Sequence, residues 1–336
     1  LGCRSWCGTS RRLRLGRESV AGEDGEGNNA WSPDAIVHVK YVCSCALRLW
    51  RSAVHVYDPV DITSWRDGLA LGSGLLQVDA VLVTTSLAAR DVRRHPAFLA
   101  AGNVSVFWLP IHHSNFQRLR SRDPRRNVET VGVHTQHKDR RLVELLAAAL
   151  PPSSKEGRPP PRFLHLDPTT LFRTTEGRVI TPQQTEQLYQ QLAMLDVGVA
   201  KMSGCTSDWW FCSRWRTGQR LVNLLSVGIP AVVWSDAQGH LDIVEGRWPP
   251  QSGGLAGFGE EGEAGRAPPD LRYPTELVVV GERQARDALR LLLGNASLRV
   301  EARRQGLRLA ARFSLPRIAA RFARILRNLV RRRTAR

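Results

Sequence analysis

The sequence is poor in lysine: four of its 48 basic residues are lysines, and the other 44 are arginines. It has no apolar run of about 18 residues, the length that a membrane-spanning helix needs. Its six cysteines have no paired C-x2-C spacing, which argues against a structural zinc site. Its 28 glycines and 19 prolines follow no fixed period, which excludes collagen. No metal site is therefore expected, collagen is excluded, and no segment of this sequence is expected to span a membrane.

What is present is typical of a globular protein. The chain has 336 residues, of which 42% are apolar and 24% charged, so it can bury a substantial core. Its length is more than twice that of a typical domain, which predicts two domains. The sequence starts at Leu1 rather than Met, so it leaves the compartment open between the cytoplasm and the lumen of the secretory pathway. We expect a soluble protein.

The formal net charge of +17 is concentrated at the end of the chain. Residues 281–336 hold 16 arginines against Glu282, Asp287 and Glu301. One interpretation is a patch for nucleic acid, an acidic membrane or another polyanion. The other, which we favour because no nucleic-acid-binding motif accompanies the charge, is the solvated face of C-terminal helices.

The order of apolar segments predicts two α/β domains. Residues 1–33 lack apolar periodicity and are expected to be disordered or the remnant of a truncated first strand. Continuous apolar runs, typical of buried parallel strands, then follow in two series. The first series has runs at 35–42, 53–58, 79–85 and 104–110, and the second at 128–134, 162–167, 196–200, 229–234 and 275–281. Helical spacing separates the strands of the second series, at 139–150, 181–195 and 216–226.

The predicted fold is α/β, with two Rossmann-like domains facing a cleft. The first domain is expected over 34–125 and the second over 126–315, with a flexible insertion at 251–269 and a C-terminal helix and basic tail at 316–336. In open α/β sheets, ligands bind beyond the carboxyl ends of the strands. We therefore expect the chemistry where those ends of the two sheets meet.

One segment, Arg216-Thr217-Gly218-Gln219-Arg220-Leu221-Val222-Asn223, carries the clearest chemical signal. It opens a helix that ends at Gly228, ahead of a buried strand. Backbone N–H groups at a helix start, together with Arg216 and Arg220, form a site suited to a diphosphate.

This segment, with the following SDAQGHLDIVEG (235–246), resembles the donor-binding half of GT-B glycosyltransferases, particularly the group 1 family. VETVGVHTQ (128–136) is similar to the first strand and phosphate loop of that half. The closing helices are also similar, and the resemblance is strongest over about 126–330. Three features depart from the family: Asn223 and Trp215 stand where glutamates are common, and the loop after Val133 is His134-Thr135-Gln136 rather than glycine-rich.

The resemblance implies a sugar-nucleotide donor held by the second domain, with no cofactor besides this substrate. It also implies C-terminal helices that pack back toward the first domain. The expected donor-binding residues are Arg216, Thr217, Gly218, Arg220, Asn223, Gly132 and His134.

Each expected site residue also has an ordinary structural interpretation. Arg216 and Arg220 could equally be exposed helix arginines, Asn223 a polar helix position and Gly132 a packing position. Asp58 and Asp61, after a first-domain strand, could activate an acceptor hydroxyl or form a turn. Trp215 could stack on a ring of the ligand or pack in a core.

The predicted function is glycosyl transfer from a nucleotide sugar to an unidentified glycan, protein or small-molecule acceptor. Because arginines can stabilise the leaving diphosphate, we expect no metal requirement. Two alternatives remain: a non-catalytic binding protein of the same fold, and a polyanion or nucleic-acid binder that acts through the arginine-rich C-terminus.

Overall fold

The computed structural model describes nine stretches of the chain. They are residues 32–39, 42–59, 72–110, 123–134, 140–150, 159–166, 182–201, 213–249 and 271–335. Asp61, most of the segment 1–33 and the predicted insertion 251–269 lie outside them. Within the stretches, no helix is both long enough and apolar enough to cross a membrane.

The first sheet has four parallel strands in the order β1-β2-β3-β4. These strands are β1 (Ala35–Val39), β2 (Val54–Asp58), β3 (Ala80–Val83) and β4 (Ser105–Trp108). The helices that connect them are α1 (Ser44–Leu49), α3 (Ser86–Arg94) and α4 (Pro96–Ala101). Every strand falls inside an apolar run of the first series, because strands buried on both faces need continuous hydrophobicity.

The second sheet has five parallel strands in the order β6-β5-β7-β8-β9. They are β5 (Thr130–His134), β6 (Arg162–Leu166), β7 (Val197–Ala200), β8 (Ala231–Trp234) and β9 (Val278–Val279). The strand expected over 275–281 is shorter than predicted, because a 3-10 turn, η2 (Thr275–Leu277), buries Leu277 just before it.

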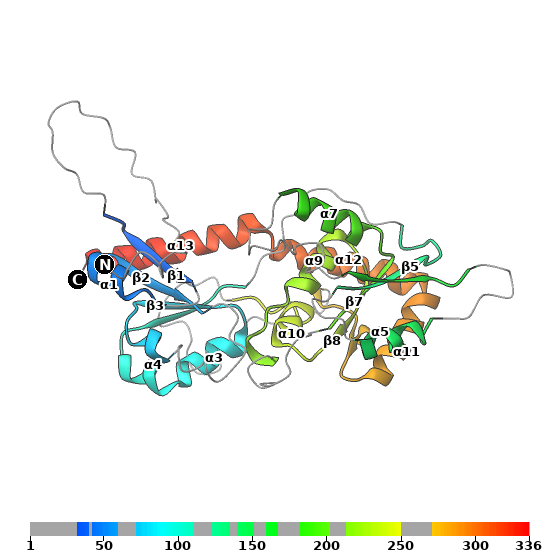
Figure 1. Cartoon of the computed structure of the whole chain (residues 1–336), viewed down its shortest axis with the longest axis horizontal. Helices are drawn as coiled ribbons and strands as arrows, with labels where there is room; N and C mark the ends of the chain where they lie inside the picture. The colour runs from blue at the N-terminus through cyan, green and yellow to red at the C-terminus, as the bar shows by residue number, and fades with distance from the viewer. Residues whose placement is uncertain are drawn as a thin grey trace, which may run out of the picture.

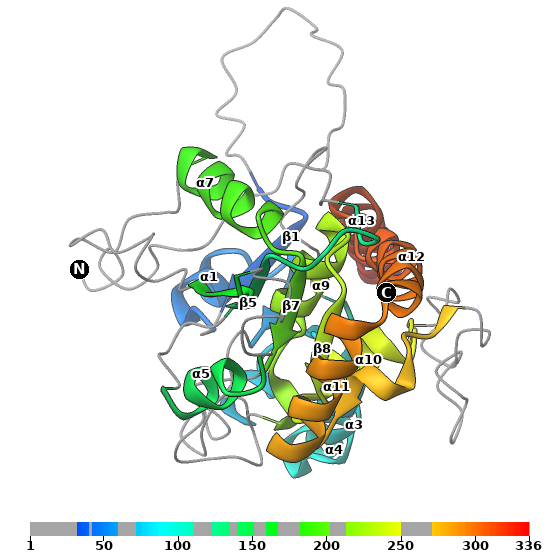
Figure 2. The same cartoon turned by 90° about the vertical axis from the view of Figure 1, so that its right-hand side faces the viewer.

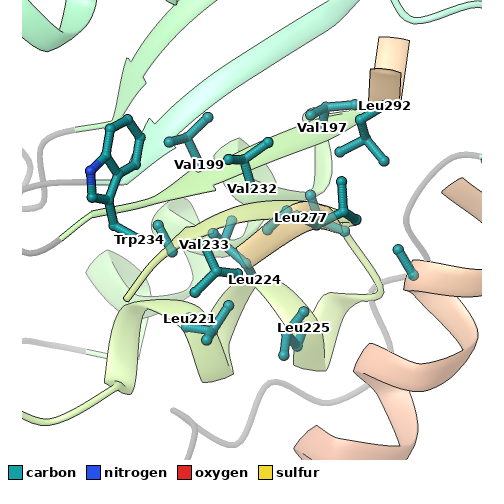
Figure 3. Packing of buried hydrophobic residues seen from close by; sticks show 14 of the residues in the cluster. Val197, Val199, Leu221, Leu224, Leu225, Val232, Val233, Trp234, Leu277 and Leu292 are labelled. Carbon is teal, nitrogen blue, oxygen red and sulfur yellow. The ribbon is translucent and has the colours of Figure 1, made fainter. Parts of the chain in front are cut away.

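Helices cover both faces of the second sheet. They are α5 (Arg140–Ala147), α7 (Pro182–Ala193), α9 (Gln219–Val227), α10 (Gln238–Val244), α11 (Glu282–Gly294) and α12 (Ala296–Arg312). Helices α7, α9 and α12 pack together on one side, and α5 and α11 pack together on the other (Figures 1 and 2). The side chains of α9 and of the central strands form the interior of this domain (Figure 3).

The last helix, α13 (Leu315–Thr334), runs from the second domain along the first sheet (Figure 1). Its side chains Ile325, Leu326 and Leu329 are buried in a cluster with Val54, Val56 and other residues of the first sheet. The opposite face of that sheet packs on Val92 and other residues of α3. The expected return of the C-terminal helix to the first domain is therefore confirmed.

Candidate functional site

Helix α9 begins beside the carboxyl edge of the second sheet. Gly218 is its N-cap residue, so Arg216 and Thr217 precede the helix, which starts three residues later than predicted. The reason is a contact across the domain boundary: the carbonyl groups of Arg214 and Trp215 accept hydrogen bonds from first-domain residues. The N–H groups of the first turn lack partners within the helix, as at every helix start. These N–H groups can donate hydrogen bonds to a bound anion.

The beginnings of α9 and α10 approach each other closely at two glycines. A Cβ atom at Gly218 would lie 2.5 Å from the carbonyl oxygen of Gly239, and one at Gly239 would lie 2.3 Å from the amide nitrogen of Gly218. Real side chains essentially never come that close to backbone. Glycine at these positions therefore lets the two helix starts pack directly, which places them next to each other at the same sheet edge.

The segment ahead of α9 also contacts the first domain. The hydroxyl of Thr85 donates to the carbonyl oxygen of Arg214 at 2.5 Å. The hydroxyl of Thr84 donates to the carbonyl oxygen of Trp215 at 3.4 Å. The Trp215 side chain is buried in the first-domain core with Tyr57 and other residues. The structure therefore supports packing of Trp215 in a core rather than stacking on a ligand ring. That core belongs to the first domain, although Trp215 precedes a helix of the second.

A buried carboxylate of the second domain holds the start of α3 in the first domain. Asp242 accepts hydrogen bonds from the Ser86 amide at 2.9 Å, the Ser86 hydroxyl at 2.6 Å and the Gln238 side-chain amide at 2.7 Å. The carboxylate thus stabilises the positive end of α3. Burial raises the pKa of Asp242, although these hydrogen bonds oppose the rise.

An ion pair reinforces the same boundary. The Nε atom of Arg214 donates to Oδ2 of Asp91 in α3 at 2.8 Å, and Nη2 of Arg214 contacts the other carboxylate oxygen. This hydrogen-bonded contact raises the pKa of Arg214. The segment that was expected to bind the donor therefore lies where the two domains meet.

Several basic groups gather at the carboxyl edge of the second sheet. The Nε atom of Arg216 is buried and has no hydrogen-bond partner in the described part of the chain. Lys201, directly after β7, places its ammonium group 5.4 Å from the ring centre of Trp234 at the end of β8. His240 in α10 is buried, and this burial and the nearby charge of Arg220 lower its pKa to about 4.

Comparisons with known proteins identify the architecture. No family model and no curated protein matches the sequence. A sucrose-phosphate synthase from Thermosynechococcus elongatus is similar in structure, with a TM-score of 0.52 and 14% identity over 85% of this chain and 70% of that one. The chain has the GT-B fold.

A second structure agrees with this assignment. The pneumococcal O-GlcNAc transferase GtfA, solved in complex with UDP and GlcNAc, has a TM-score of 0.51 and 11% identity to this chain. The match covers 88% of this chain and 57% of GtfA, so the chain spans little more than half the length of that neighbour. At these identities the likeness establishes the GT-B fold.

The predicted donor residues occupy different environments within the GT-B fold. Asn223 lies in α9 and is 3% exposed. A Cβ atom at Gly132 would lie 2.4 Å from a methyl group of Leu195, so this glycine makes room for core packing. His134 is the last residue of β5, at the carboxyl edge. The roles of these residues in donor binding stay predictions.

The predicted acceptor residues lie in the first domain. Asp58 ends β2, half-buried at the carboxyl edge of the first sheet, while Asp61 lies outside the described residues. Within the described stretches, no group of three or more His, Cys, Asp and Glu side chains gathers in a way that could hold a metal ion.

Sequence reasoning assigned no role to Lys201, Gln238, His240 or Asp242. The signal that could have found Asp242 is its position four residues after Gln238 on a short helix that is buried almost all round. An acidic residue in such a helix needs a partner.

Proposed function

We propose that the chain is a glycosyltransferase that moves a sugar from a nucleotide-sugar donor to an acceptor, with the donor held by the second domain. The GT-B fold supports this proposal, because the neighbour GtfA is an O-GlcNAc transferase solved with UDP and GlcNAc. Fold alone does not define chemistry, so the argument rests on the residues at the domain boundary.

The observation that carries the proposal is the unpartnered Nε atom of Arg216. It lies two residues ahead of the α9 N-cap, at the boundary between the domains. A buried donor without a partner costs free energy, about 1–3 kcal/mol for an ordinary group. A diphosphate oxygen at the start of α9 would satisfy this donor and the helix amides together.

The proposed chemistry requires stabilisation of negative charge on the leaving diphosphate. Arg216 and the amides at the start of α9 provide it most directly, and Arg220 and Lys201 add positive charge at the same sheet edge. His240 is neutral at pH 7 because its pKa is about 4, so it adds no charge there. Asp58 is the proposed group that orients an acceptor hydroxyl or accepts its proton.

Donor binding tests the role of Arg216. We expect Arg216→Ala to weaken the binding of a nucleotide diphosphate roughly 10- to 100-fold, because a charge-assisted hydrogen bond is lost. The measurement is calorimetry with a panel of sugar nucleotides. Arg290→Ala, which removes an exposed arginine of α11, is the matched control. Unchanged affinity in Arg216→Ala removes this residue from the site.

Turnover separates the proposal from its main alternative. We expect transfer or slow hydrolysis of one sugar nucleotide of the panel, and an unchanged rate after EDTA treatment. The alternative is a non-catalytic binding protein, which the packing of Trp215 in the first-domain core favours, since a family glutamate position is thereby used for structure. Binding without turnover across the panel would support that alternative.

A further inference from the structure

The C-terminal part of the chain is strongly basic. From Ala302 to Arg336 it contains 12 arginines and no acidic residue. At least four of these arginines have partners within the protein. Arg304 pairs with Glu301, Arg312 donates to Gly246, Arg321 donates to Trp108, and Arg333 pairs with Asp79.

Four other arginines form a line on α13 that we call the arginine stripe: Arg317, Arg324, Arg327 and Arg331. All four are exposed, and their guanidinium groups make no hydrogen bond or ion pair in the described part of the chain. Residues seven apart in an α-helix lie almost directly above one another, so Arg317, Arg324 and Arg331 align. Arg327 lies beside them, and the stripe spans about 21 Å along the helix axis.

The rest of α13 fixes the direction in which the stripe points. The buried side chains Ile318, Ile325, Leu326 and Leu329 occupy the opposite side of the helix, and the last three lie in the first-domain core. The helix therefore cannot roll its apolar side outward without opening that core. The stripe stays turned away from the protein.

The stripe is unfavourable for the isolated protein. Arg324 and Arg327 are three residues apart, and Arg327 and Arg331 are four apart, and like charges at these spacings repel one another. The positive charge of Arg324 also adds to burial in lowering the pKa of Arg321 to about 10. An external polyanion would relieve this repulsion.

We propose that the arginine stripe is a docking surface for a membrane that contains anionic phospholipids. A straight helix touches a flat surface along its whole length, and arginines bind lipid phosphates through paired N–H groups. Since the apolar side of α13 is occupied by the core, the contact is electrostatic and remains at the level of the headgroups.

A nucleic acid is the weaker candidate for this surface. Single-stranded nucleic acids bind where aromatic side chains alternate with basic ones along a groove. On α13 the aromatic side chain Phe322 is partly buried against the first-domain core, on the side opposite the stripe. The stripe thus offers charge without a stacking platform.

Vesicle sedimentation with the full chain tests the proposal. We expect binding to phosphatidylcholine vesicles that contain phosphatidylserine, no binding to pure phosphatidylcholine vesicles, and loss of binding at high salt. Each stripe arginine contributes roughly fivefold to the partition coefficient. The double variant Arg324→Gln and Arg327→Gln should therefore bind about 25-fold more weakly.

The matched control is the double variant Arg283→Gln and Arg286→Gln on α11. These arginines are exposed, are also three residues apart, and carry the same charge. We expect the control to bind within about twofold of the unaltered chain, because α11 lies in the second domain, away from α13 (Figure 1), and salt screens distant charges. An equal loss in both variants would show that net charge acts rather than the stripe.

Two further outcomes would overturn the proposal. One is the absence of binding to anionic vesicles. The other is tighter binding to a mixed-sequence RNA than to vesicles at equal total charge, with the stripe variant losing the RNA binding. The second result would identify a nucleic acid as the partner. Because the assay uses no sugar nucleotide, its outcome is independent of the proposed transferase activity.

Discussion

Two buried histidines of the first sheet form a chain of hydrogen bonds. The Cys43 amide donates to Nδ1 of His38 at 3.1 Å, and Nε2 of His38 lies 2.9 Å from Nδ1 of His55. Nε2 of His55 lies 3.0 Å from the carbonyl oxygen of Trp50. Each ring nitrogen of the two histidines has a suitable hydrogen-bond partner if both rings are neutral and each Nε2 carries the proton.

This arrangement predicts acid sensitivity. Burial, with help from the charge of His55, lowers the pKa of His38 to about 4 from its ordinary 6.5. Between pH 6.5 and about 4, His38 is protonated in the unfolded chain but neutral in the folded chain. The free energy of unfolding therefore falls as the pH falls through this range. The loss reaches at most about 3 kcal/mol. Chemical denaturation at a series of pH values measures it.

A non-titrating variant identifies the group responsible. His38→Gln should be less stable at pH 7, because it breaks the hydrogen-bond chain, but its stability should depend less on pH below 6.5. His55, whose pKa is also lowered by burial, and His240 in the second domain, whose pKa is about 4, add further dependence of the same sign. An unchanged pH dependence in His38→Gln would contradict the assignment. Above pH 7 both proteins should show little dependence.

At the scale of elements, periodicity predicted the strands and the main helices well. Apolar runs found every strand of both sheets, because parallel strands buried on both faces leave an uninterrupted signal. The start of α9 was misplaced, since a contact made by Trp215 across the domain boundary decides it. Asp242 received no role because its partner Ser86 is 156 residues away. Partners at such distances leave no local pattern.

The two glycines between α9 and α10 predict a sharp mutational contrast. In Gly239→Ala, the new methyl group would meet backbone atoms of Arg216, Thr217 and Gly218, which cannot move aside as a side chain can. We expect a loss of about 1–3 kcal/mol in the free energy of unfolding. Donor affinity should also fall, because the segment holding Arg216 must shift. Urea denaturation and calorimetry measure the two effects.

Gly294→Ala is the control for this prediction. A Cβ atom at Gly294, the last residue of α11, would have nothing within 4 Å, so alanine should be neutral or slightly stabilising. If Gly239→Ala proved as stable as Gly294→Ala, the two helix starts could not be packed as closely as the structure shows.

At the scale of the whole molecule, the domains are joined by polar contacts that are largely buried. Asp242 holds the start of α3, Arg214 pairs with Asp91, and the Trp215 ring lies in the first-domain core. Removing one partner of a buried, charged contact is costly because the others lose their hydrogen bonds. The two domains should therefore unfold together.

The variant Asp242→Ala should allow the two domains to unfold separately. The change leaves the amide and the hydroxyl of Ser86 without their acceptor, and we expect the free energy that couples the two domains to fall by about 3 kcal/mol. Calorimetry should then show two separate transitions, and amide exchange should quicken in the first turn of α3. Asp287→Ala, which removes an exposed partner of Arg290, should leave a single transition. A single transition in Asp242→Ala would contradict the coupling.

The position of α13 has a consequence for biosynthesis. Because β1 to β4 follow one another in order across the sheet, right-handed connections carry α1, α3 and α4 to the same face. In the described part of the chain, the other face is covered by side chains of α13, which is translated after every strand of both sheets. The first domain therefore cannot bury Val54, Val56 and Leu82 until translation has passed Leu329. By that point, most of the helices that cover the second sheet have already been translated.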